Sequence, residues 1–253
     1  MRAKARIRAD RIPYEVPGRA ELPDRLVPVL HVVYLVFTEG YAPASGPAVV
    51  RADLADEAIR LGRLLVELLP EPEVRGLLAL MLLQDSRRAA RTGADGELVL
   101  LADQDRSRWD RASIAEGALL VRRALAGGEI GPYTVQAAIA LAHAEAPTAA
   151  ATDWARIVDL YDLLRRADPS PVVELNRAAA VAMRDGPAAG LDLVEALVDG
   201  PLDGYHLAHA ARADLLRRLG RTAHARAAYE RALALTRHEP QQRFLRRRLA
   251  ELG

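Results

Sequence analysis

The second half of the chain repeats a two-helix pattern, and this repeat restricts the fold more than any other feature of the sequence. The stretch from His206 to Leu235 has the periodicity of two amphipathic helices joined at Gly220. Ala213 and Ala225 stand where two such helices must approach closely, and Tyr229 takes the bulky position. A chain with this pattern is expected to stack pairs of helices one after another.

The same pattern recurs twice upstream. Val194 takes the bulky position 35 residues before Tyr229, and Tyr161 takes it 33 residues before Val194. A period of about 34 residues is typical of tetratricopeptide repeats. Residues 131–253 therefore resemble three such repeats, the first degenerate, with a capping helix at 241–252 whose arginines surround one apolar face.

Proline and glycine mark the ends of the predicted helices. Pro70 ends one helix, and Pro72 is placed to start the next as a first-turn residue. The predicted helices are 24–38, 53–69, 72–84, 107–126, 132–146, 152–166, 171–184, 187–198, 203–219, 222–237 and 241–252. Residues 1–22 are predicted to be a basic segment and a proline-rich connector, the tail of a domain that lies upstream.

A charged stretch from Asp85 to Asp110 interrupts this helical pattern. Gly93 to Gly96 is a turn signal, and the apolar segment 97–101 after it has the character of a short strand, so a small β-hairpin is predicted at about 88–101. An isolated hairpin is marginal in water, so it must pack on the helices. The predicted fold is mainly α: a helical domain with a small hairpin at 23–130, followed by a tetratricopeptide-like α-superhelix at 131–253.

Composition excludes several classes of protein. The chain has 35 basic and 34 acidic residues, a balance that argues against a dedicated nucleic-acid wrapper. It has no cysteine, which excludes disulfides and thiol catalysis and fits a cytoplasmic location. No apolar run is long enough to span a bilayer. We therefore predict a cytoplasmic protein without membrane contact.

Candidate chemical sites are few. The acids Asp103, Asp105 and Asp110 could bind a metal, but the arginines between them favour internal salt bridges. His206 and His209 are spaced for a shared metal, but no third ligand is evident. In the simpler interpretation Asp105 caps a helix and the arginines brace the hairpin; in the other, the same charges form a face for a partner. We predict that the protein is not an enzyme, with no cofactor and no small-molecule substrate.

Six separated motifs together resemble a known family. They are RIPYEVP at 11–17, ELPDRL at 21–26, VVYLVFTEGY at 32–41, ALMLLQDSRRAAR at 79–91, GELVLLADQDRSRWD at 96–110 and FLRRRLAEL at 244–252. In this order they resemble the long C-terminal extension of those extracytoplasmic-function RNA polymerase sigma factors that carry a tetratricopeptide-repeat tail. The two DNA-reading sigma domains of that family are missing from this sequence.

The resemblance implies a regulatory protein-interaction domain that modulates sigma-dependent transcription initiation. Its implied partners are the sigma-factor DNA-reading domains, the RNA polymerase core or both, with DNA reached only through them. A stand-alone tetratricopeptide adaptor that binds a peptide or protein is the alternative. The candidate partner-binding residues are Arg87, Arg88, Asp103, Asp105, Arg106, Arg108, Asn176, Arg177, Tyr205, His209 and Arg212.

Overall fold

The computed structural model describes residues 18, 21–43, 45–46, 49–94, 96–128 and 130–253. The predicted basic segment and connector at 1–22 therefore lie almost wholly outside the described residues. The chain divides into two compact units, 1–32 and 33–253. In the described residues of the first unit, Arg25 and Glu21 form an exposed ion pair at 3.8 Å.

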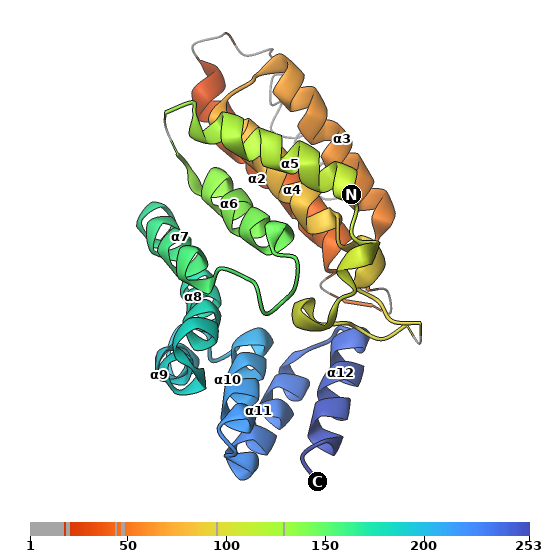
Figure 1. Cartoon of the computed structure of the whole chain (residues 1–253), viewed down its shortest axis with the longest axis vertical. Helices are drawn as coiled ribbons and strands as arrows, with labels where there is room; N and C mark the ends of the chain where they lie inside the picture. Colours follow the sequence, from red (N-terminus) through yellow and green to blue (C-terminus); the bar gives the residue numbers. More distant parts are fainter. Residues whose placement is uncertain (1–17, 19–20, 44, 47–48, 95, 129) are drawn as a thin grey trace, which may run out of the picture. The chain divides into compact units, whose positions relative to one another are not determined.

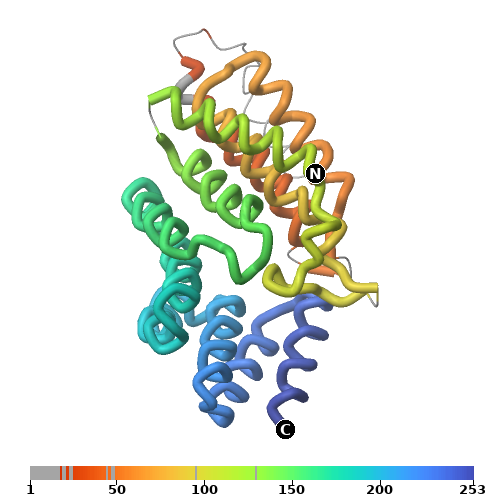
Figure 2. Tube along the Cα trace, in the orientation of Figure 1, coloured from red at the N-terminus to blue at the C-terminus, as the bar shows by residue number. Residues whose placement is uncertain are grey.

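Helices account for most of the described chain, and no strand occurs in that part, which confirms the mainly α prediction. Figure 1 labels the helices, and Figure 2 follows the chain through them. They are α2 (Leu22–Tyr41), α3 (Ala52–Leu68), α4 (Pro72–Asp85), α5 (Arg111–Leu125), α6 (Pro132–Glu145), α7 (Trp154–Ala167), α8 (Pro171–Asp185), α9 (Pro187–Val198), α10 (His206–Arg218), α11 (Thr222–Leu235) and α12 (Glu239–Ala250).

Helix α4 lies at the centre of a bundle with α3, α5 and α6, which we call the first bundle. Its residues from Leu77 to Leu83 are all buried, as expected for a helix that is apolar on every side. It packs against α3, α5 and α6. Gly76 allows α6 to approach closely, because a Cβ at this position would lie 2.6 Å from the Thr134 hydroxyl oxygen of α6. The predicted boundary at residue 130 stays a prediction.

Helices α6 to α12 each pack against the next one along the chain (Figure 1). The small residues singled out in the sequence, Ala213 and Ala225, are fully buried, and so is Ala178 of α8. The two predicted bulky positions Val194 and Tyr229 lie in the same apolar cluster, which α12 completes with Leu245. Tyr161 packs against a second cluster, formed by α6, α7 and α8.

The segment between α4 and α5 differs from the predicted hairpin. Its described residues form one antiparallel bridge, Thr92 with Leu98, rather than two strands. The predicted flanks instead contain the 3₁₀ turns η2 (Arg88–Ala90) and η3 (Leu101–Asp103), and a third 3₁₀ turn, η4 (Arg106–Arg108), follows. We call residues 86–110 the connecting segment.

Helix α5 begins at Arg111 rather than at the predicted residue 107. The Asp110 carboxylate accepts hydrogen bonds from the backbone N–H of Ala112 at 2.9 Å and of Ser113 at 3.2 Å, which fixes the N-cap there. Asp105 makes the equivalent bond one turn earlier, to Ser107 N at 2.9 Å, and caps the short η4 turn. The prediction that Asp105 caps a helix is correct only for this short turn.

The C-terminal helix returns to the start of its unit. The Arg243 guanidinium on α12 donates to the Glu97 carboxylate at 2.6 Å. Just before α12, His238 forms a parallel bridge with Gly46. In Figure 2 the start of the last helix lies next to the connecting segment, and the helix runs away from it toward the C-terminus. A residue near the start of the unit, Gly46, is thus in direct contact with His238 near its end. Among the described helices, none has both the length and the apolar character to cross a bilayer.

Candidate functional site

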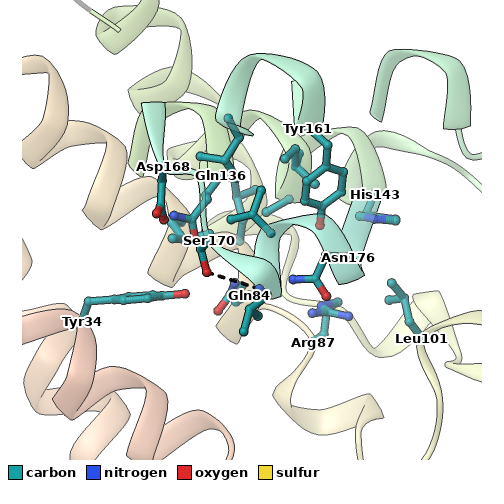
Figure 3. Close-up of a pocket in the computed structure, with 17 residues that line it drawn as sticks. Tyr34, Gln84, Arg87, Leu101, Gln136, His143, Tyr161, Asp168, Ser170 and Asn176 are labelled. Carbon is teal, nitrogen blue, oxygen red and sulfur yellow. Dashed lines mark hydrogen bonds between the residues drawn. The ribbon is translucent and has the colours of Figure 1, made fainter. Parts of the chain in front are cut away.

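A cavity of about 430 Å³ lies between α4, α6, α7 and α8. Figure 3 shows the side chains that line it. They come from α4, α6, α7 and α8, from Tyr34 of α2 and from Leu101 of η3. Arg87 of the connecting segment and Asp168 and Ser170 between α7 and α8 complete the lining. Helix α6 packs against both α4 and α7. It therefore holds the cavity residues of α4 close to those of α7.

Polar groups dominate the labelled part of the wall. Three amides line it, from Gln84, Gln136 and Asn176, and two tyrosines enter it, Tyr34 and Tyr161. They are joined by Arg87, His143, Asp168 and Ser170. A concave site with a few converging polar groups is the usual form of a ligand-binding site.

The two tyrosines are kept in their neutral form. Burial raises the pKa of Tyr34, and the hydrogen bond with Gln84 only partly offsets this effect. Burial, with a smaller contribution from Tyr34, raises the pKa of Tyr161 to about 12. Both hydroxyl groups can therefore donate as well as accept hydrogen bonds at neutral pH.

His143 is also neutral. Its pKa is lowered to about 4, first by burial and then by the positive charges of Arg87 and Arg106. Its ring meets Trp154 edge-on at 5.2 Å between centroids. Its Nδ1 atom is buried without a hydrogen-bond partner among the described residues.

Arg87 connects the cavity to the end of α2. Its guanidinium donates to the Tyr41 hydroxyl oxygen at 2.6 Å. Arg91 stacks on the same ring at 3.6 Å and donates to the Tyr41 carbonyl oxygen. Burial lowers the pKa of Arg91. Two arginines from the connecting segment thus hold the end of α2, and Arg87 has guanidinium donors left over for the cavity.

Three of the six predicted contact residues of the connecting segment, Arg87, Arg88 and Arg106, contact other parts of the protein. Arg88 is paired with Asp85 at 2.8 Å and with Asp56 at 2.6 Å. Arg106 donates to the carbonyl oxygens of His143 and Ala146, at 2.7 and 2.8 Å, at the C-terminal end of α6. These two residues are therefore bracing groups, and their assignment to a partner surface is not supported by their contacts.

Three charged residues of the same segment remain at the surface. Asp103, Asp105 and Arg108 are exposed. Asp105 is used as a cap, and Asp103 lines a second cavity of about 580 Å³ beside Phe244 and Arg247 of α12. The salt bridges predicted between these acids and the neighbouring arginines are not formed among the described residues, because the acids accept backbone N–H bonds or face solvent.

Four of the five contact residues predicted between residues 131 and 253 also make contacts inside the protein. His209 is buried, and its Nε2 lies 2.6 Å from the Asp203 carbonyl oxygen. Tyr205 packs against the apolar cluster of α8 to α12. Arg177 pairs with Asp162 at 2.7 Å, and Arg212 with Glu195 at 3.2 Å.

Of the predicted repeat residues, Asn176 alone is exposed. The structure brings it together with Arg87 at one wall of the 430 Å³ cavity. The other cavity residues were not identified from the sequence, because they come from four helices and no local motif connects them. No group of three metal-binding side chains occurs among the described residues.

Comparisons with known proteins cover the chain to different extents. A family of unknown function, DUF6596, matches residues 25–125, which include the connecting segment and end with α5. An uncharacterized protein of Rhizobium meliloti (strain 1021) is 49% identical over 253 residues. That match covers 100% of this chain but 60% of the relative, so the chain spans about 60% of the length of the curated relative it matches.

Proposed function

We propose that the chain is a non-enzymatic regulatory domain of an extracytoplasmic-function sigma factor, which acts in the cytoplasm by protein–protein interaction. It modulates transcription initiation by contacting the sigma-factor DNA-reading domains, the RNA polymerase core or both. The observation that carries this proposal is the conjunction of sigma-tail motifs with consecutive helix pairs. These pairs are consistent with a tetratricopeptide-like superhelix, a scaffold that presents extended binding surfaces.

The packing at Gly190 supports the repeat assignment. A Cβ at this position would lie 2.8 Å from the Ala178 carbonyl oxygen, so α8 and α9 approach each other through small residues. The same arrangement of small residues is buried in α10 and α11, at Ala213 and Ala225. Close packing of this kind leaves the outer faces of the helices for a partner.

The length of the Rhizobium relative also supports the proposal. Because 60% of that protein aligns with this chain, a similar sequence occurs there as one part of a longer protein. A regulatory tail attached to further domains has this organisation.

The contacts reduce the candidate docking face to a few residues. Asp103 and Arg108 of the connecting segment are exposed. They carry opposite charges, so a partner surface that contacts them is expected to have opposite charges in the complementary order. The other arginines of the segment hold α2, α3 and α6 in place.

The test is a titration of the purified chain against the DNA-reading domains of an extracytoplasmic-function sigma factor and, separately, against core polymerase. We expect micromolar or tighter binding to at least one of them, weakened about tenfold by Arg108→Glu. Arg166→Glu, an exposed arginine on α7, is the matched control and should leave binding unchanged. Absence of association with both partners would refute the sigma assignment and leave the stand-alone adaptor.

A further inference from the structure

The 430 Å³ cavity carries opposite charges at its two ends. Figure 3 shows Asp168 with Gln136 on one side and Arg87 with Asn176 on the other, with Ser170 and Gln84 between them. A simple anion would be repelled by Asp168, and a simple cation by Arg87. A ligand that carries both charges, separated along its length, matches both ends.

Several polar groups of the cavity wall have no partner in the protein. Within the described part of the chain, the Asp168 carboxylate and the side-chain amides of Gln136 and Asn176 make no hydrogen bond, and neither does the Tyr161 hydroxyl, which Figure 3 shows directed into the cavity. The buried Nδ1 of His143 is likewise without a partner there. Polar groups in such a site are normally satisfied by a ligand or by ordered water.

The middle of the cavity suits a peptide bond. Amide side chains donate and accept hydrogen bonds at once, and so do the neutral phenols of Tyr34 and Tyr161. These groups match the N–H and C=O of a backbone amide. The volume, about 430 Å³, lies within the range of small-ligand cavities.

We propose that this cavity binds a small zwitterionic peptide of about dipeptide size, with its carboxylate at Arg87 and its ammonium group at Asp168. An arginine guanidinium can hold a carboxylate through two parallel hydrogen bonds. The unpartnered Asp168 carboxylate accepts from the ammonium group. The amides of Gln84, Gln136 and Asn176 contact the peptide bond. This site does not depend on the sigma-factor function, because the chain alone contains every group that forms it.

Calorimetric titration of a set of zwitterionic dipeptides into the purified chain tests the proposal. For the tightest dipeptide, N-acetylation and C-terminal amidation should each lower the affinity at least about tenfold, because each removes one charge-assisted hydrogen bond. Free amino acids should bind more weakly than the dipeptide. No binding at millimolar dipeptide, or equal affinity for the blocked forms, would overturn the proposal.

A variant pair assigns the ammonium end. Asp168→Asn should weaken the free dipeptide about tenfold and leave the affinity of its N-acetylated form unchanged, since that form has no ammonium group to lose. Asp159→Asn, an exposed carboxylate on α7 outside the cavity, is the control. Equal loss for the free and acetylated forms would contradict the assigned orientation. Because sigma domains and polymerase are absent from this assay, its outcome is independent of the docking test.

Discussion

At the level of single residues, His143 has the most unusual environment. It is partly buried at the cavity wall, and this burial, with the positive charges of Arg87 and Arg106, lowers its pKa to about 4. In the unfolded chain an imidazole titrates near 6.5. The folded protein therefore binds fewer protons at this site than the unfolded chain between these two values.

Stability should consequently fall as the pH is lowered. The contribution of His143 is fully present above pH 6.5 and is lost progressively toward pH 4, because protonation favours the unfolded chain over that range. We expect a loss of roughly 2 kcal/mol in the free energy of unfolding between pH 7.5 and pH 5. Urea denaturation at several pH values measures it.

The matched variants are His143→Gln and His224→Gln, the second at an exposed histidine of α11. The first should flatten the pH dependence of stability over this range, and the second should retain it. If the two variants show the same slope as the unaltered protein, His143 is not the group responsible.

The sequence did not single out His143. Its neighbours are small apolar residues, and the pattern indicated only a helix at 132–146. His206 and His209 were considered instead because their spacing suggests a shared metal, whereas His209 is satisfied by a backbone carbonyl oxygen. Local patterns identify which residues share a helix face, but not which distant helices enclose them.

At the level of secondary-structure elements, Glu73 links two helices. From the first turn of α4 it accepts hydrogen bonds from the backbone N–H of Tyr133 and Thr134, both at 2.9 Å, and from the Thr134 hydroxyl at 2.6 Å. The first N–H groups of α6 have no partner within the helix, and a carboxylate 61 residues away caps them. The negative charge also interacts favourably with the positive end of the helix dipole.

Removing this carboxylate should destabilise the first bundle. Glu73→Ala leaves the N–H groups of Tyr133 and Thr134 partly buried and unpaired, which costs about 1–3 kcal/mol in unfolding free energy. Glu71→Ala, at the exposed residue before α4, is the control and should change stability by less than about 0.5 kcal/mol. Similar effects of the two substitutions, measured by urea denaturation, would contradict the capping role.

Helix positions were predictable to within a few residues because their end signals are local. Pro187–Val198 matches the predicted 187–198, with proline in the first turn. The connecting segment was predicted less well. Its apolar stretch at 97–101 suggested a strand, but only one bridge forms, and the Val99 carbonyl oxygen accepts from the Gln104 side chain instead of from a partner strand. Side-chain bonds of this kind have no clear sequence signature.

At the level of the unit 33–253, two contacts join the C-terminal helix to much earlier residues. One is the Arg243–Glu97 ion pair, and the other is the bridge between His238 and Gly46. Neither was predictable, because the repeat pattern specifies only how each helix pair packs on the next.

Arg243→Ala should loosen α12 without unfolding the unit. The ion pair is partly exposed, so its loss should lower the global unfolding free energy by at most about 1 kcal/mol. Amide hydrogen exchange in α12 should become faster, since this helix loses an anchor to the connecting segment. Arg246→Ala, an exposed arginine of the same helix, is the control. Unchanged exchange in α12 would show that the pair does not anchor it.

The Arg243–Glu97 contact also has a consequence for the order in which the chain folds during synthesis on the ribosome. Helix pairs from α3 to α11 contact their neighbours in sequence, so they can form as the chain emerges. The Arg243–Glu97 contact spans 146 residues and cannot form until the last helix has been made. A nascent chain in which Arg243 has not yet left the ribosome therefore lacks the Arg243–Glu97 contact, even where earlier helices have already packed.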